Sequence, residues 1–192
     1  DLNEANVIII NTCTFIDAAK DESVQTLLQA TEYKKNGKCE KLVAAGCLSQ
    51  QFQEGLAREI PEQDVLVGTE SWSKILDAVN ESYRTGKQVN CFDSAPCEHE
   101  ELIPRQLVTP KYTAYVKIAE GCNNGCTFCY IPYVRGKARS RPIPSVVHEV
   151  KRLAAQGVKE FNLIAQDLSY YGRDLGDGTN LAGLLRELVK VE

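Results

Sequence analysis

Three cysteines that lie close together constrain this chain more than any other sequence feature. Cys122, Cys126 and Cys129 have the spacing C-x3-C-x2-C, so three thiolates lie within eight residues. Thiolates at this density can wrap one compact inorganic cluster, while Gly121 and Gly125 let the backbone approach it and donate N–H groups. Ferredoxin-type sequences supply a fourth cysteine, but none follows here at a matching spacing. Three protein ligands on a four-iron cluster leave one iron open, as substrate-activating chemistry requires.

The composition favours metal or redox chemistry over a disulfide framework. The chain has eight cysteines and no methionine, and its formal net charge is −4. No apolar run approaches the length of a membrane span. We therefore expect a cytoplasmic protein without a membrane partner, in which cysteines serve metal or redox functions.

The pattern along the chain predicts an α/β fold, because apolar runs of strand length alternate with helical periodicity. The run Val7–Ile10 is continuous, which is typical of a parallel strand buried on both faces. The other expected strands are Leu42–Ala45, Val65–Val67, Tyr112–Ile118 and Lys159–Ala165. The expected helices are Phe15–Tyr33, Gln50–Arg58, Ser73–Val79, Ser145–Gln156 and Leu181–Val191.

Two α/β units separated by a linker are the predicted organisation. Residues 86–110 contain three prolines and an acidic run, so we assign 1–85 to a first domain, 86–110 to a linker and 111–192 to a second domain. The chain starts at Asp1 and stops at a helical segment, and we expect it to be cut from a longer protein at both ends.

The cysteine motif, with the aromatic Phe128 before its last cysteine, resembles the signature of radical S-adenosylmethionine (SAM) enzymes. The resemblance implies that the three cysteines hold a 4Fe-4S cluster whose open iron binds SAM, and that Phe128 lies near this cofactor. A zinc knuckle or a disulfide loop is the alternative interpretation. Gln166 and Asp167 close a predicted strand, at the end where functional groups of such barrels gather. We expect both to contact the cofactor, although a plain strand-ending turn would also explain them.

Two further cysteines each follow a strand of the first domain. Cys13 and Cys47 should emerge at the same edge of a parallel sheet, where open α/β sheets bind ligands. From their positions alone they are either two inert buried thiols or a shared metal site. Asn11-Thr12-Cys13 and Gly46-Cys47 resemble the amino-terminal domain of the methylthiotransferases. This resemblance implies a second 4Fe-4S cluster on three cysteines, the third of which lies upstream of the present sequence.

The basic segment after the cysteine motif contains Arg135, Arg139 and Arg141. It is either a solvated loop or a source of charge that balances the cluster or anchors a carboxylate. Because Arg-Gly and Ser-Arg-Pro occur at this place in the methylthiotransferases, we assign Arg141 to cofactor binding.

Seven other residues are given no role in the chemistry. We interpret Cys39, Cys91 and Cys97 as incidental. Nearby tyrosines could stack on RNA bases, but packing is the preferred explanation; they are Tyr130, Tyr133, Tyr170 and Tyr171.

The resemblance covers almost the whole chain and implies a fold and a reaction. The expected fold is a flavodoxin-like methylthiotransferase domain followed by the first part of a radical SAM partial (β/α) barrel. The implied reaction uses two clusters and SAM to replace a C–H bond with C–S–CH3. Residues 166–172 resemble the branch that modifies the β-carbon of an aspartate in a small-subunit ribosomal protein. The implied chemistry also needs an electron donor protein as a second partner. The alternatives are a methylthiotransferase for tRNA adenosine, an iron–sulfur electron carrier and a zinc-binding module.

Overall fold

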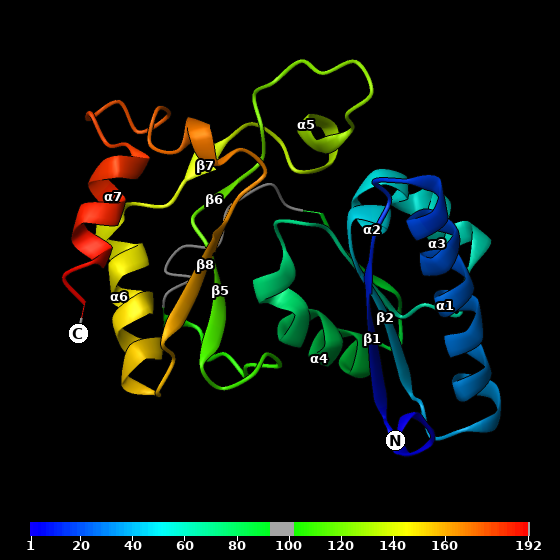
Figure 1. Cartoon of the computed structure of the whole chain (residues 1–192). Helices are drawn as coiled ribbons and strands as arrows, with labels where there is room; N and C mark the ends of the chain where they lie inside the picture. Colours follow the sequence, from blue (N-terminus) through cyan, green and yellow to red (C-terminus); the bar gives the residue numbers. More distant parts are fainter. Residues whose placement is uncertain (93–101, 192) are drawn as a thin grey trace. The chain divides into compact units, whose positions relative to one another are not determined.

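The computed structural model describes residues 1–92 and 102–191, and the chain divides into two compact units, Asp1–Cys97 and Glu98–Glu192. Both units combine parallel strands with helices (Figure 1). The first contains β1 (Val7–Thr12), α1 (Asp17–Asn36), β2 (Lys41–Gly46), α2 (Cys47–Phe52), α3 (Glu54–Glu59), β3 (Val65–Val67), α4 (Ile75–Thr85) and β4 (Val89–Cys91). The second contains β5 (Thr113–Lys117), β6 (Ala119–Glu120), α5 (Ile131–Val134), β7 (Arg139–Ser140), α6 (Ile143–Ala155), β8 (Glu160–Ile164) and α7 (Leu181–Leu188).

The first unit is a parallel sheet in the order β1-β2-β3-β4, with α1 on one face and α4 on the other (Figure 1). Leu27 of α1 packs against Leu42 and other apolar side chains of one face. Val43 and Val65 point to the opposite face and pack with Ala78 of α4. These buried layers explain why the apolar runs form strands, and the predicted α/β class is confirmed.

The expectation that the first strand is buried on both faces is wrong. Ile8 and Ile10 are buried, but Ile9 between them is 50% exposed. β1 is the first strand in the sheet order, and α4 packs over β2, β3 and β4. Ile9 therefore lies at the margin of the face that α4 covers, although Val7 on the same side of β1 still packs against that core.

The predicted helix Gln50–Arg58 is divided in two and begins earlier. α2 ends at Phe52 and α3 begins at Glu54. Gln53 between them has φ 41°, the left-handed region that few non-glycine residues adopt. The apolar side chains keep helical spacing across this break, so their periodicity could not reveal it.

A strand lies inside the segment predicted as a linker. β4 pairs in parallel with β3, and its ends are fixed by Val89 N donating to Asp64 O and Gly68 N donating to Cys91 O, both at 2.8 Å. β4 is three residues long with Asn90 exposed at its centre, so it lacks the continuous apolar run of a buried strand. Cys97 and the acidic run 98–101 lie outside the described residues.

The second unit is built on β5 and β8, which pair in parallel from Thr113 with Glu160 to Lys117 with Ile164. α6 and α7 pack together beside them (Figure 1). The core between these elements contains Ala114, Val116, Val146, Leu153 and Leu184. β6 and β7 form a two-residue antiparallel ladder, which the sequence pattern did not predict. Of the described helices, none combines the length and apolar character needed to cross a membrane.

Candidate metal centres

The cysteine motif forms a loop that leaves β6 and returns through β7. The antiparallel pairs at its base join Ala119 to Ser140 and Glu120 to Arg139. Gly121 has φ +78°, and a Cβ there would lie 2.2 Å from the Lys137 carbonyl oxygen. Only glycine permits so close a backbone approach at this dihedral angle, so the base of the loop is fixed just before the first cysteine.

All three cysteines line one cavity of about 570 Å³. Cys122 is buried, Cys129 is partly buried and Cys126 is exposed. Tyr133 and Lys137 also line the cavity. Across the described residues, no three His, Cys, Asp or Glu side chains gather tightly enough to hold a single metal ion. Three sulfurs spread around a shared open cavity suit a cluster of several irons, which has a larger surface than one ion.

Hydrogen-bond donors already point at the buried sulfur. Asn124 donates to Cys122 Sγ from its backbone nitrogen at 3.5 Å and from Nδ2 at 3.4 Å. Outer hydrogen bonds of this kind orient thiolate ligands and tune a bound metal group. The residues present therefore fit an iron–sulfur cluster on this loop.

The loop is attached to a segment more than forty residues further along the chain. Asn124 Nδ2 donates to Asp167 Oδ2 at 2.9 Å, and Asn123 Nδ2 donates to Tyr170 Oη at 2.9 Å. Asp167 also accepts from Ser169, and the hydrogen bonds from Ser169 and Asn124 hold the pKa of this carboxyl below its usual value. Neither asparagine was singled out from the sequence, although two amide side chains within a ligand loop are a usable signal.

Two predicted cofactor residues, Gln166 and Phe128, differ in their exposure to solvent. Gln166 follows β8, and its Oε1 is buried without a hydrogen-bond partner among the described residues. A buried acceptor of this kind normally has a donor, so Gln166 is suited to receive one from a ligand. Phe128 is 86% exposed, which leaves its ring face open.

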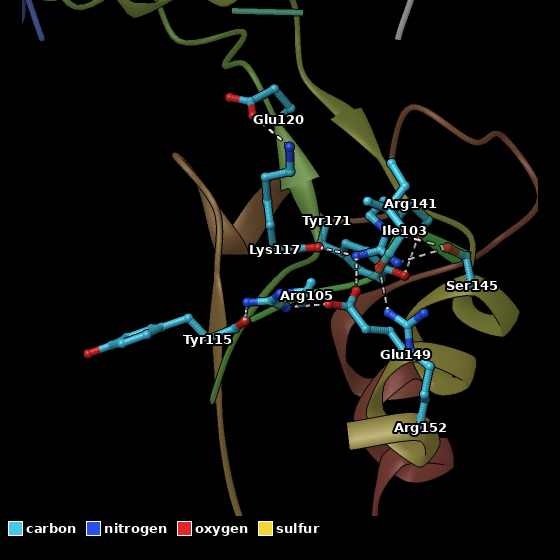
Figure 2. Close-up of polar contacts among 10 residues, drawn as sticks. All are labelled: Ile103, Arg105, Tyr115, Lys117, Glu120, Arg141, Ser145, Glu149, Arg152 and Tyr171. Atoms are coloured by element: carbon cyan, nitrogen blue, oxygen red, sulfur yellow. Dashed lines mark hydrogen bonds and ion pairs between the residues drawn. The ribbon is translucent and has the colours of Figure 1, made fainter. Parts of the chain in front are cut away.

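Arg141, the remaining predicted cofactor residue, is committed elsewhere (Figure 2). Its guanidinium donates to Glu149 Oε2 at 2.6 Å and to the Lys117 carbonyl at 2.8 Å. Ser145 Oγ accepts two further bonds from it, at 3.0 and 3.3 Å. This charge is balanced by a nearly buried carboxylate, and Arg141 joins β5 to α6. The sequence alone does not indicate this pairing, because Glu149 is one of several acidic residues on predicted helices.

Glu149 is the centre of this polar network. It also pairs with Arg105, which donates in turn to the Tyr115 carbonyl at 2.9 Å (Figure 2). Tyr171 Oη donates to the Arg141 carbonyl at 2.7 Å. Burial raises the pKa of the Tyr171 phenol to about 12, so it remains a neutral donor at physiological pH. The network therefore connects the start of the second unit, β5, α6 and the segment after β8.

A second charged group lies beside the cysteine loop. Glu120 accepts from Arg135 at 2.8 Å and from Lys117 at 3.1 Å. Burial would raise the pKa of Glu120, but the two cations outweigh it and hold the pKa below its usual value. Arg139 donates to the carbonyls of Lys137 and Arg135. These two arginines thus have partners within the loop region.

The first unit brings Cys13 and Cys47 to one edge of its sheet, as predicted from their positions after two strands. Thr12 and Gly46, the residues just before them, are register partners in β1 and β2. Gly46 has φ +100°, and a Cβ there would lie 2.7 Å from the Thr12 carbonyl oxygen. Both cysteines are partly buried, so neither residue is enclosed in the core.

Hydrogen bonds fix the segments that follow these two cysteines. Ser23 Oγ of α1 accepts from Cys13 N at 2.9 Å, and its single hydrogen can be donated to Ala19 O at 2.8 Å or to Cys13 O at 3.1 Å. Thr14 donates to the Gln51 side chain of α2. Two cysteines alone do not complete a cluster site, so this pair can supply only part of one.

Of the residues without an assigned role, Cys39 and Cys91 lie in the first unit, whereas Tyr133 lines the loop cavity and Tyr170 and Tyr171 form the hydrogen bonds described above. Cys39 is buried in the first core, and burial raises the pKa of its thiol. Cys91 belongs to β4. Tyr130 and Tyr133 stack on one another with ring centroids 5.2 Å apart.

Comparison with protein families gives one match for each unit. Residues 1–68 match an uncharacterized protein family, UPF0004, and residues 116–191 match the radical SAM superfamily.

Several similar curated proteins carry the same name. The ribosomal protein uS12 methylthiotransferase RimO of Syntrophotalea carbinolica is 52% identical over 100% of this chain and 42% of its own length. The protein of the same name from Geobacter sulfurreducens is 45% identical over 100% of this chain and 43% of its own length.

Among solved structures, the radical SAM methyltransferase TsrM from Kitasatospora setae, with tryptophan and a SAM analogue bound, gives a TM-score of 0.62 at 15% identity. The match covers 96% of this chain and 40% of that one. At this identity the likeness shows the fold alone.

Proposed function

Because this chain belongs to the family of radical SAM methylthiotransferases, we propose that it forms part of an enzyme that adds a methylthio group to a protein aspartate. The chain spans 42% of the length of its relative from Syntrophotalea carbinolica. The whole protein's reaction, substrate and partners are therefore inferred from this part.

The observation that carries the proposal is the cavity shared by Cys122, Cys126 and Cys129. In the proposed enzyme these thiolates hold a 4Fe-4S cluster, and Asn124 donates hydrogen bonds to one of them. When bound, such a cluster supplies the electron that starts radical chemistry on SAM. The chain itself keeps the loop in shape through Gly121 and its close contact with Lys137.

Gln166 and Phe128 are the proposed cofactor contacts. The buried, unpartnered Oε1 of Gln166 can accept a hydrogen bond from an amino or hydroxyl group of SAM. Phe128 offers an exposed ring that can stack on an adenine base. Arg141 and Asp167 are left out of this proposed set. The donors of Arg141 are engaged by Glu149, Ser145 and a backbone carbonyl, and the carboxylate of Asp167 accepts from Asn124 and Ser169.

Cys13 and Cys47 are the proposed ligands of a second 4Fe-4S cluster. Their thiols follow aligned positions of two neighbouring parallel strands, and a third cysteine from another part of the protein would complete the set. This cluster would carry the sulfur that becomes the methylthio group.

The proposed substrate is the β-carbon of an aspartate in small-subunit ribosomal protein uS12. The name of the relatives supports this choice, as does the Gln-Asp pair followed by Ser-x-Tyr-Gly in residues 166–172. A cytoplasmic location and an electron donor protein belong to the same proposal, since ribosomal proteins are made there and the cluster must be reduced.

The test uses the full-length protein, reconstituted anaerobically with iron and sulfide and supplied with SAM and a reductant. Ribosomal protein uS12 and bulk tRNA are offered in parallel, and mass spectrometry detects an added methylthio group. We expect the group on an aspartate of uS12, and no product from a protein that carries Cys126→Ala. Methylthio on tRNA would keep the chemistry and overturn the substrate, whereas the absence of SAM cleavage would overturn the enzyme and favour an electron carrier.

A further inference from the structure

Two hydrogen bonds from one amide nitrogen connect a carboxylate to the buried cysteine of the loop. Asn124 Nδ2 donates to Asp167 Oδ2 at 2.9 Å and to Cys122 Sγ at 3.4 Å. An amide nitrogen carries two hydrogens, so both bonds can exist at once. The Asn124 amide therefore bridges the Asp167 carboxylate and the Cys122 sulfur.

The carboxylate is held in place for this contact. Asp167 Oδ1 accepts from the backbone and the hydroxyl of Ser169, at 3.0 and 2.7 Å, which leaves Oδ2 for Asn124. The same short 3₁₀ helix, Leu168–Tyr170, also fixes the neighbouring Asn123 through the Tyr170 hydroxyl. The two adjacent asparagines are thus both hydrogen-bonded to the same turn, so the contact between Asn124 and Asp167 is one of two that attach the cysteine loop to it.

Hydrogen bonds to ligating sulfurs and nearby charges both set the reduction potential of an iron–sulfur cluster. A donor on the sulfur stabilises the reduced cluster, because reduction adds negative charge. A carboxylate close by has the opposite effect and favours the oxidised cluster. Asp167 combines the two influences, since it orients the Asn124 donor and contributes one negative charge.

We propose that Asp167 is a positioning residue that holds the Asn124 amide on the Cys122 sulfur and lowers the reduction potential of the cluster by its charge. The proposal rests on the proposed function, since it requires a cluster on this loop. It gives a physical role to a residue that the sequence associates with substrate choice. Asparagine at this position could accept the same hydrogen bond without the charge, so the two residues would differ in the ease of cluster reduction.

The experiment is a redox titration followed by electron paramagnetic resonance on the full-length protein. Cys13→Ala and Cys47→Ala are present throughout, so that the loop cluster gives the signal. Asp167→Asn is compared with the unsubstituted residue at a fixed potential. A charge about 6 Å from the sulfur at a water-exposed site changes such a ratio about threefold, and we expect Asp167→Asn to raise the reduced-to-oxidised ratio by that amount.

Matched variants distinguish a local effect of the Asp167 charge on cluster reduction from general effects of a substitution. Asp177→Asn removes one charge from a residue whose side chain accepts from Thr179 N, and it should leave the ratio unchanged. Asp167→Glu keeps the charge and should remain closer to the unsubstituted protein than Asp167→Asn does. SAM affinity, measured by calorimetry, should be the same with and without the Asp167→Asn substitution.

Three results would overturn the proposal while leaving the proposed function intact. They are an unchanged ratio in a fully iron-loaded Asp167→Asn protein, an equal shift in Asp177→Asn, and a loss of iron or of SAM affinity in Asp167→Asn. A protein with the native Asp167 that assembles no cluster on the loop would instead overturn the proposed function.

Discussion

The two cysteine sites of this chain are held in place by different means. Cys13 and Cys47 follow directly from paired strands, so the hydrogen bonds of a parallel sheet align them. Cys122, Cys126 and Cys129 lie on a loop closed by only two antiparallel pairs, and its shape depends on side chains from other segments. The first site is therefore a property of the backbone, and the second is a property of a polar network.

The two units should also differ in how strongly single substitutions change their stability. Backbone pairing in a sheet tolerates most side-chain changes, because each strand is held by several equivalent bonds. The second unit also contains the buried polar network around Glu149, which is sensitive to single substitutions because removing one member leaves its partners buried and unsatisfied. Single substitutions should therefore affect the stability of the two units differently.

The largest expected effect is that of Glu149→Gln in the second unit. Its carboxylate is 4% exposed and pairs with both Arg141 and Arg105. Loss of this charge leaves a buried guanidinium without compensation, and we expect the free energy of unfolding of this unit to fall by about 3–5 kcal/mol. Urea denaturation measures the change.

Glu187→Gln is the matched control, because Glu187 forms an exposed pair with Lys190 within one helix. Such pairs contribute about 0–1 kcal/mol. If both variants lose equally little stability, the network around Glu149 does not hold the second unit together.

Gly121→Ala tests the one feature that the two sites share, a left-handed glycine immediately before a cysteine. Backbone strain of about 1–3 kcal/mol adds to a contact of 2.2 Å with the Lys137 carbonyl, so we expect a lower melting temperature and reduced iron binding. Gly125→Ala is the control for stability, because a Cβ there meets nothing within 4 Å. Equal melting temperatures for the two variants would contradict this role of Gly121.

Tyr171→Phe should have a smaller effect that depends on pH. Removal of the hydroxyl leaves the Arg141 carbonyl without this donor and costs about 1–2 kcal/mol near neutral pH. Since the folded pKa is raised to about 12, the unfolded chain loses this proton first, and the native protein loses stability between about pH 10 and 12.

The phenylalanine variant lacks this titration, so its disadvantage should shrink as pH rises through that range. Stability measured at several alkaline pH values checks the prediction. A constant difference between the two proteins would show that Tyr171 does not titrate as described.

The smallest expected effect is that of Ser23→Ala in the first unit. Ser23 is the side chain of α1 that fixes Cys13, and its loss should cost about 0.5–1.5 kcal/mol. Because strand pairing still aligns Cys13 with Cys47, we expect the full-length protein to retain iron at the proposed first site. A loss of iron at that site would break the contrast, since it would make a side chain decisive there as well.

The sequence predicted the elements that carry a continuous apolar pattern and missed the features that no such pattern marks. Val65–Val67 is a strand as expected, because three consecutive valine and leucine side chains need burial on both faces. β4 was missed because its three residues carry no continuous apolar run. The break at Gln53 was missed because it is a matter of one dihedral angle.

The site follows the same division. Motif spacing was enough to bring together the three loop cysteines, and position after two strands was enough for Cys13 and Cys47. For Arg141 the sequence shows the charge but not the partner, because the contact with Glu149 depends on how α6 packs. Asn124 escaped notice because its importance depends on a contact with distant Asp167.

The parallel pairing of β5 with β8 has a consequence for the order of folding. Thr113 pairs with Glu160, 47 residues later, and the entire cysteine loop lies within this crossover. In the first unit Val7 pairs with Lys41, Val43 with Val65, and Val65 with Val89, so those closures span shorter stretches. Pairings between distant residues form slowly because loop closure costs conformational entropy. The first sheet should thus form early, and a metal group bound inside the long crossover would shorten the remaining search by cross-linking it, which couples cofactor insertion to the rate of folding.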